Sequence, residues 1–301
     1  MVAQRRPILG LALGSGGARG WCHIGVLREL EAMGIRPDVI SGASMGAFVG
    51  AIYAGGSLDA LEDWACNLTG RQFFGMLDVR PGSGGLIQGG EIPSTIRRLV
   101  KQQQIEDLPI PLALVATDMA TGREVWMTKG DLADAVRASV ALPGVISPIR
   151  IDDRWFLDGG LTNPVPVSVC RVLGAEVVIA VNPNGRLDGT FWAEREQQGV
   201  TLWKSWGDRL RMLPAPVAEM LLNNNGKEAA PHYLDVLSAS IDIMTDGIRR
   251  TKLAGDPPHV LLDAHLSDLS VLDFHRAREA IEEGHRLVRE NADAIAQVMR
   301  L

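Results

Sequence analysis

Short apolar runs alternate with segments of helical periodicity from the N-terminus of the chain onward. Residues 7–13 form a continuous apolar run, the pattern of a strand that is buried on both faces. A glycine-rich turn follows, and the apolar spacing after it predicts a helix that ends near Gly34. Residues 37–41 predict a second strand, and residues 45–54 predict a second helix. This order of strand, helix, strand and helix predicts a parallel sheet with crossover helices.

The alternation continues to the C-terminus and predicts one α/β domain spanning residues 1–301. Further strands are expected at residues 112–117, 124–127, 154–157, 176–181 and 259–262. Further helices are expected at residues 58–65 (after an N-cap at Ser57), 92–100, 132–140, 167–173 and 274–299. Residues 81–90 predict a glycine-rich loop. Residues 183–230 are rich in Asn, Gly, Pro and Gln, so we expect an insertion or a lid there.

The composition excludes several classes of protein. With 30 Lys and Arg against 36 Asp and Glu, the net charge of −6 argues against a broadly basic nucleic-acid binder. The hydrophobic fraction of 46% is sufficient for a core and excludes global disorder. Cys22, Cys66 and Cys170 form no CxxC pair and no Cys/His cluster, so we expect neither disulfides nor a metal site. Three scattered cysteines are typical of a reducing compartment.

Two apolar stretches imitate targeting or membrane segments. Residues 8–13 follow two arginines, but the run stops at the glycine-rich turn and no cleavage site follows. Residues 39–58 carry no charge, but two glycines interrupt the far end, which favours a strand, a turn and a buried helix. We therefore expect no signal peptide and no transmembrane helix. The expected location is the cytoplasm, with peripheral contact at the inner face of the membrane left open.

Gly42-Ala43-Ser44-Met45-Gly46 matches G-x-S-x-G, the sequence of a nucleophile elbow. Such an elbow places the serine on a tight turn between a strand and a helix, where flanking side chains have no room. Strand and helix patterns lie on the correct sides of Ser44. A glycine-rich turn in a buried crossover would show the same residues, so this motif alone gives the catalytic and structural interpretations equal weight.

A second glycine-rich segment, residues 14–20 (GSGGARG), lies between the first strand and the first helix. Its backbone N–H groups can converge on an anion, either a phosphate or the oxyanion of an acyl-transfer intermediate. The dinucleotide pattern G-x-G-x-x-G fails because Arg19 stands at its last position. A nucleotide-phosphate loop needs Lys followed by Ser or Thr, and Arg19-Gly20 stand there instead. The oxyanion interpretation is therefore preferred.

An activated serine needs a general base. His259 and His265 flank the last expected strand, and either could complete a Ser-Asp-His triad. Asp158 ends an apolar strand and is followed by two glycines. Desolvation can raise the pKa of such a carboxyl so that it serves as the base, although Asp-Gly is also a common turn pair. The residues alone leave the choice of base open.

Taken together, the motifs resemble those of the patatin-like phospholipase family. Three of them stand in the family's order: residues 16–20 (GGARG), 42–46 (GASMG) and 158–160 (DGG). Two further stretches fit the same family: residues 138–144 (ASVALPG) and 158–166 (DGGLTNPVP). The chain looks like the bacterial branch, which is similar to the catalytic domain of neuropathy target esterase. The resemblance runs from about Ile8 to the final helix and is weakest across residues 183–230.

The resemblance implies a three-layer α/β/α patatin-like fold with a mostly parallel central sheet. It also implies a Ser-Asp dyad that hydrolyses acyl esters, in which Ser44 is the nucleophile. Asp158 would be the base that activates first this serine and then the attacking water. No metal and no organic cofactor are implied, and the substrate would be a phospholipid or a lysophospholipid.

The resemblance also assigns the glycine-rich segments. The oxyanion hole would be formed by the backbone of Gly16, Gly17, Ala18 and Arg19, and the Arg19 side chain would stabilise this loop or nearby anionic groups. The motifs would be supported by Gly20, Gly42, Gly46, Gly159 and Gly160. The chain departs from the family at Ser15, which stands where the family has the first Gly of the run G-G-G-x-R-G.

Within residues 183–230, one face of an expected helix carries Trp203, Trp206, Leu210 and Leu213. Tryptophan with basic residues nearby suits peripheral contact with a membrane. A lid over the active site, or the interface of a homodimer, explains the same face, and we rank these two above membrane insertion. Two other functions stay open: a nucleotide-binding α/β protein, and a regulatory or scaffold protein with little turnover.

Overall fold

The computed structural model of the 301-residue chain describes residues 5–69, 85–185 and 233–300. Its strands are β1 (Leu9–Leu13), β2 (Val39–Ala43), β3 (Gly85–Ile87), β4 (Leu112–Asp118), β5 (Glu124–Met127), β6 (Gly144–Ile146), β7 (Ile149–Ile151), β8 (Arg154–Asp158), β9 (Val177–Asn182) and β10 (Val260–Asp263). Its α-helices are α1 (Cys22–Ala32), α2 (Met45–Ala54), α3 (Leu58–Cys66), α5 (Glu91–Leu99), α6 (Leu132–Ser139), α7 (Val167–Val172), α10 (Tyr233–Gly255), α11 (Ala277–Glu290) and α12 (Ala292–Met299). Short 3₁₀ helices are η1 (Gly17–Trp21), η2 (Ile105–Asp107), η3 (Gly159–Leu161) and η4 (Phe274–Arg276).

The central sheet has the strand order β10-β9-β1-β2-β4-β8-β7, and β5 also pairs with β4. Strands β10, β9, β1, β2 and β4 are parallel to their neighbours in this order. Strands β5 and β8 are antiparallel to β4, and β7 is antiparallel to β8. The expected mostly parallel sheet is therefore confirmed, with antiparallel strands added at the β4 end.

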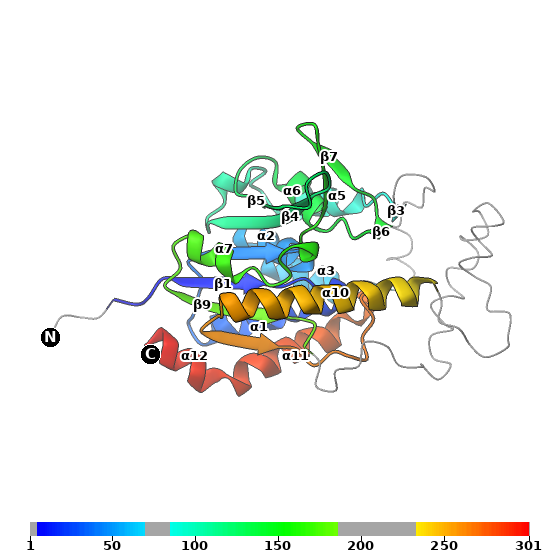
Figure 1. Ribbon diagram of the computed structural model, residues 1–301. Helices are drawn as coiled ribbons and strands as arrows, with labels where there is room; N and C mark the ends of the chain where they lie inside the picture. The colour runs from blue at the N-terminus through cyan, green and yellow to red at the C-terminus, as the bar shows by residue number, and fades with distance from the viewer. Residues whose placement is uncertain (1–4, 70–84, 186–232, 301) are drawn as a thin grey trace, which may run out of the picture.

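Side-chain size alternates along β1 and decides how closely each helix layer approaches. Leu9, Leu11 and Leu13 are fully buried in the larger core, together with apolar residues of α1, α2, α3, α5, α6 and α11. On the opposite face, a Cβ on Gly10 would lie 2.6 Å from the Cβ of Ala175, so α7 and the turn after it pack directly against the backbone. Helix α10 crosses in front of the sheet on this side, where Leu253 packs against a smaller apolar cluster that includes Ala12 and Val178 (Figure 1). The three-layer α/β/α architecture is confirmed.

The final helix differs from its prediction. The sequence predicts one helix over residues 274–299, whereas the structure has η4, α11 and α12 in succession. Asn291 separates the last two, with φ −106° and ψ 13°. Its side-chain amide donates to the carbonyl of Leu287 at 2.9 Å, a bond that satisfies one of the helix's terminal acceptors. An asparagine at this position therefore ends α11 although the apolar spacing continues.

A further prediction needs correction, and another is confirmed without its expected hydrogen bond. Residues 81–90 were expected to be loop, but part of this stretch forms β3, which pairs in parallel with β6. Ser57 is the N-cap residue of α3, as expected, although its hydroxyl makes no capping bond and donates instead to the carbonyl of Leu99 at 2.6 Å. Strands of three residues, such as β3, β6 and β7, carry too short a pattern for periodicity to reveal.

The expected helix with Trp203, Trp206, Leu210 and Leu213 lies outside the described residues, as does nearly all of the expected insertion at residues 183–230. Within the described ranges, no helix combines the length and apolar character that crossing a bilayer requires.

Candidate active site

The sequence motifs meet at one edge of the sheet, where the parallel strands end. Residues 14–20 follow β1, Ser44 follows β2, and Asp158 ends β8. Strand β1 lies between β2 and β9. The strands that follow β1 in sequence are added first on the β2 side and later on the β9 side, so the strand order reverses at β1. Loops at such a point leave a crevice outside the carboxyl ends of the strands, where ligands bind in open α/β sheets.

Ser44 occupies a tight turn between β2 and α2. Its φ of 53° and ψ of −120° lie in a region that costs an L-residue about 1–3 kcal/mol. Its flanking glycines permit the turn: a Cβ on Gly42 would lie 2.6 Å from the Cα of Ala47, and one on Gly46 would overlap the carbonyl of Leu13. This is the geometry that the G-x-S-x-G motif predicts.

The stretch at residues 138–144 braces this turn, a role that the sequence did not reveal. The Ser44 N–H donates to the Ser139 hydroxyl at 2.9 Å, and that hydroxyl donates to the carbonyl of Val115 at 2.6 Å. Two residues later, the carbonyl of Ala141 accepts from the N–H of Asp158 at 3.0 Å. One short segment therefore bonds to the backbone of both residues that carry the expected chemistry.

Ser44 and Asp158 are in direct contact. The Ser44 hydroxyl donates to Oδ2 of Asp158 at 2.6 Å, and Oδ1 accepts from the N–H of Gly160 at 2.7 Å. Asp158 is 2% exposed, and this burial raises its pKa to about 6, while the two hydrogen bonds act in the opposite direction. A carboxylate with a pKa near neutrality is suited to accept a proton from a serine hydroxyl.

The glycines after Asp158 allow neighbouring chain to come close. A Cβ on Gly159 would overlap the carbonyl of Val115, and one on Gly160 would lie 2.9 Å from the hydroxyl oxygen of Ser15. The Asp-Gly-Gly sequence therefore brings β8 against both β4 and the loop after β1.

The glycine-rich loop offers two backbone donors. Two of the residues expected to form the oxyanion hole use their N–H groups within the protein. Ala18 donates to the carbonyl of Val271 at 2.9 Å, and Arg19 donates to the carbonyl of Gly16 at 3.1 Å. The N–H groups of Gly16 and Gly17 carry no hydrogen bond to other described parts of the chain. Both glycines line the same cavity as Ser44. Among the described residues, these two N–H groups of the loop therefore remain without an acceptor.

The Arg19 side chain is buried beneath this loop. Its Nε donates to the carbonyl of Leu269 at 2.8 Å, and its Nη1 donates to Asn184 Oδ1 at 2.9 Å and to Asp242 Oδ2 at 3.1 Å. Arg19 is 5% exposed, so it supports the loop from within. Sequence reasoning missed Asn184 and Asp242 because no local motif marks either residue.

The histidines considered as alternative bases are engaged elsewhere. His259 Nδ1 accepts from the N–H of Val178 at 3.0 Å. His259 directly precedes β10, where the parallel strands begin, whereas Ser44 follows β2, where they end. His265 lies 3.2 Å from the guanidinium of Arg286. Among the described lining of the cavity beside Ser44 there is no histidine. Nor do the described residues bring three His, Cys, Asp or Glu side chains together as a metal site would need.

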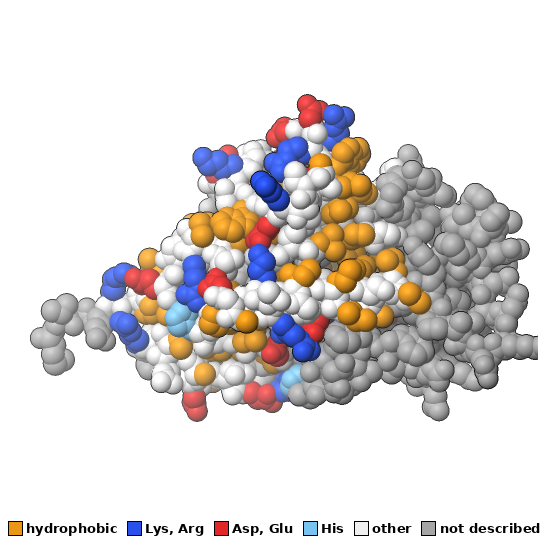
Figure 2. Space-filling view, in the orientation of Figure 1, with side chains coloured by type: hydrophobic (Ala, Val, Ile, Leu, Met, Phe, Trp, Pro, Cys, Tyr) orange, Lys and Arg blue, Asp and Glu red, His pale blue; other side chains and the backbone are white. Residues whose placement is uncertain are grey.

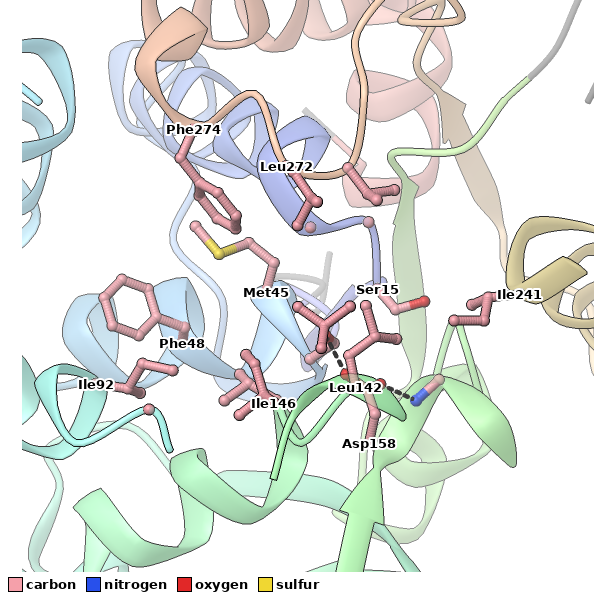
Figure 3. A pocket seen from close by; sticks show the side chains of 18 of the residues that line it. Ser15, Met45, Phe48, Ile92, Leu142, Ile146, Asp158, Ile241, Leu272 and Phe274 are labelled. Carbon is pink, nitrogen blue, oxygen red and sulfur yellow. Dashed lines mark hydrogen bonds between the residues drawn. The ribbon is translucent and has the colours of Figure 1, made fainter. Parts of the chain in front are cut away.

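The cavity that opens from Ser44 and Asp158 is apolar over most of its surface. Figure 3 shows Asp158 near one end and Phe48, Ile92 and Phe274 toward the other. The apolar lining comes from α2, α3, α5, α10, the short elements η1, β3, β6, η3 and η4, and the segments next to α3, β6 and η4: Trp21, Met45, Phe48, Trp64, Leu68, Ile87, Ile92, Val140, Leu142, Val145, Ile146, Leu161, Leu237, Ile241, Val271, Leu272 and Phe274. Such a lining suits a hydrocarbon chain rather than a charged ligand.

Aromatic rings form the part of the wall one helical turn beyond the serine. Phe48 follows Ser44 by four residues, about 6 Å along α2. Trp21 packs edge-on against Phe48 at 6.2 Å, against Trp64 at 5.9 Å and against Phe274 at 6.1 Å between ring centroids. These four rings make a rigid boundary to the apolar cavity.

Helix α10 lines the cavity with Leu237 and Ile241 and shows other apolar residues to the outside. Val236, Ile243 and Met244 are 50%, 53% and 53% exposed on its outer side. Figure 2 shows apolar side chains gathered on this part of the surface, while charged side chains are more frequent away from it. One helix therefore contributes both to the wall of the cavity and to this outer apolar surface.

Comparison with known proteins places the chain in a family. The model of the patatin-like phospholipase family matches residues 11–171, more than half of the chain. An NTE family protein of Mycobacterium tuberculosis is 33% identical over 335 aligned positions, which cover 96% of this chain and 92% of that protein. Mouse patatin-like phospholipase domain-containing protein 7 is 34% identical over 207 positions, which cover 66% of this chain and 15% of that protein.

Among solved structures, VipD from Legionella pneumophila superposes with a TM-score of 0.47 at 14% identity, over 97% of this chain and 67% of that one. This likeness is too low to add to the assignment. The family model and the full-length similarity to the mycobacterial protein are sufficient, and they show that the chain belongs to the patatin-like phospholipase family.

Proposed function

We propose that this chain hydrolyses acyl esters of phospholipids or lysophospholipids through a covalent acyl intermediate on Ser44. Membership in the patatin-like phospholipase family supports a lipid-ester hydrolase in general. The finer proposal is carried by one observation, the 2.6 Å hydrogen bond from the Ser44 hydroxyl to a buried carboxylate with a raised pKa.

In the first half of the reaction, Asp158 takes the hydroxyl proton as the Ser44 oxygen attacks the ester carbonyl carbon. The carbonyl oxygen becomes an oxyanion, and the N–H groups of Gly16 and Gly17 are available to stabilise it. When the tetrahedral intermediate collapses, the bond to the alcohol oxygen breaks and Asp158 returns its proton to that oxygen. The alcohol leaves, and the acyl group stays on Ser44.

In the second half, water replaces the alcohol. Asp158 takes a proton from the water as its oxygen attacks the acyl carbon, and the same two N–H groups stabilise the second oxyanion. Collapse breaks the bond to the Ser44 oxygen, which recovers a proton from Asp158. The products are a free fatty acid and the regenerated site.

The apolar cavity supports an acyl chain as the part of the substrate that this site binds. Its described lining contains no Lys, Arg or His side chain, so nothing in that lining favours an anionic headgroup inside the cavity. The acyl chain then contributes through burial, at about 0.8 kcal/mol for each methylene removed from water. We therefore propose that the headgroup lies outside this cavity.

The test is release of fatty acid by the purified full chain from lysophosphatidylcholine micelles and from phosphatidylcholine mixed micelles. Wild-type protein is expected to release fatty acid, and Ser44→Ala is expected to abolish the release. Ser240→Ala is the matched control, because this serine is exposed on α10 and bonds within that helix to Val236. Release that persists in Ser44→Ala, or no release by folded wild-type protein from either lipid, would contradict the proposal.

A further inference from the structure

We propose that Asp242, on α10, is a positioning residue that holds the oxyanion loop in place through Arg19. The inference rests on the proposed function, because it assigns the loop after β1 a role in stabilising an oxyanion. The Arg19 guanidinium lies 3.1 Å from Oδ2 of Asp242 and 3.4 Å from Oδ1. Their side chains are 6% and 8% exposed, so this is a buried ion pair.

Burial makes the pair a strong constraint on the position of the loop. A guanidinium taken out of water needs a compensating charge and filled hydrogen bonds, and removing one partner of such a pair is costly. Asp242 supplies the charge and accepts from Nη1, Asn184 accepts from the same Nη1, and the carbonyl of Leu269 accepts from Nε. Among the described residues, Asp242 on α10 is therefore the acidic partner that balances the charge of Arg19.

Two hydrogen bonds anchor the loop on either side of the N–H groups of Gly16 and Gly17, and one of them runs through a partner of Arg19. Asn184, which accepts from Arg19, also donates its Nδ2 to the carbonyl of Ser15 at 2.9 Å. On the other side, Ala18 donates its N–H to the carbonyl of Val271 at 2.9 Å. Gly16 and Gly17 lie between these two anchors, so their peptide planes are set before substrate binds. Donors that need no reorganisation are what oxyanion stabilisation requires.

The anchoring residues come from outside the part of the chain that carries the family motifs. The family model ends at residue 171, whereas Asn184, Asp242, Leu269 and Val271 all follow it. Helix α10 also provides Leu237 and Ile241 to the cavity wall. One helix thus contacts the acyl-chain cavity and holds the loop that faces the ester carbonyl.

A positioning role has a kinetic signature that separates it from substrate binding. Asp242 borders the cavity, so a direct contact with substrate would appear as a change in KM. Displacement of oxyanion donors weakens only the transition state, and misplacement of a catalytic group by 1 Å can cost about a hundredfold in rate. We expect Asp242→Asn to lower kcat on p-nitrophenyl octanoate about tenfold to a hundredfold, with KM nearly unchanged.

Asp246→Asn is the matched control. It makes the same substitution one turn further along α10, at a residue that pairs with Arg249 at 2.6 Å and with Arg250 at 2.7 Å. This variant is expected to keep the wild-type kcat. Asp242→Glu, which retains the charge, is expected to recover part of the kcat lost in Asp242→Asn.

Loss of fold is separated from loss of position by the double variant Arg19→Gln/Asp242→Asn. The double variant removes both charges of this buried pair together, so Tm is expected to recover while kcat stays low. Recovery of both Tm and kcat would overturn the inference, as would a raised KM with normal kcat in Asp242→Asn. So would normal kcat in Asp242→Asn. If wild-type protein itself shows no Ser44-dependent turnover, the proposed function fails, and this inference fails with it.

Discussion

Ser44 and Asp158 meet because both are placed by neighbouring residues of β4. Ala43, directly before the serine, pairs with Val115, and Asp158 pairs with the next residue along, Ala116. The two side chains are 114 positions apart in sequence, yet their oxygens lie 2.6 Å apart. Strand register sets this distance, so the pair is held by the rigid centre of the fold rather than by a flexible loop.

The pH dependence of turnover is expected to follow Asp158. Burial raises the pKa of this carboxyl to about 6, and it accepts a proton only when it is ionised. We expect kcat/KM for p-nitrophenyl octanoate to rise as pH increases through about 6 and then to level off. A profile that is flat across this range, or one with its midpoint at the ordinary aspartate pKa, would contradict the assignment.

Ionisation of Asp158 is also expected to lower the unfolding free energy of the protein at neutral pH. Its folded pKa of about 6 lies above the ordinary value of 3.8, so between these values the folded state holds the proton more tightly than the unfolded state does. The unfolding free energy therefore falls as pH rises through this window, by up to about 3 kcal/mol.

Asp158→Asn cannot ionise, but its amide can still accept from Gly160 and donate to Ser44. We expect this variant to be more stable than wild type at about pH 7, with most of the difference gone near pH 4. Urea unfolding at the two pH values measures this. A difference that is the same at both would show that ionisation of Asp158 is not its cause.

Ser139→Ala is expected to lower both stability and turnover. It leaves the Ser44 N–H without its acceptor in a strained turn, at a cost of about 1–3 kcal/mol. The control is Ser57→Ala, which also removes a hydroxyl bonded to a carbonyl, that of Leu99, away from the cavity. Thermal melting should show losses in both variants, whereas kcat should fall only in Ser139→Ala. An equal kcat in the two variants would contradict the claim that Ser139 helps to position Ser44.

Trp64→Ala is expected to shift preference toward longer acyl chains. This side chain lines the cavity within the aromatic wall, and its removal lengthens the space that a chain can fill. One methylene in an apolar pocket is worth about tenfold or more in specificity, so the ratio of kcat/KM for a sixteen-carbon over a four-carbon p-nitrophenyl ester should rise at least about tenfold. Trp155→Ala is the control, since Trp155 is 50% exposed and lies outside the cavity lining. A chain-length profile that changes equally in both variants would contradict the role of the wall.

The part of the site that sequence can predict is the part enforced by close backbone contacts. At Gly46 any Cβ would overlap the Leu13 carbonyl, and at Gly159 it would overlap that of Val115. Only glycine fits such positions, so the constraint is written into the local sequence. The apolar runs of β1 and β9 are equally local signals, because both strands are buried on both faces.

What sequence could not predict depends on contacts between distant residues. Arg19 and Asp242 are 223 positions apart, and an aspartate on a helix gives no local sign that it faces a buried arginine. The role of Ser139 was hidden for the same reason, since its partner Ser44 is 95 positions away. The break at Asn291 was missed because one polar residue outweighed an apolar spacing that favours a continuous helix.

Labelling of the purified full chain with a fluorophosphonate tests the central claim most directly. The account expects wild-type protein to be labelled at Ser44, as located by peptide mass spectrometry, and Ser44→Ala to be unlabelled. It expects labelling of Asp158→Asn to be slower by about 10²- to 10⁴-fold, the usual contribution of a general base. Labelling at another serine, no labelling of folded wild-type protein, or an unchanged rate in Asp158→Asn would contradict a serine activated by this aspartate.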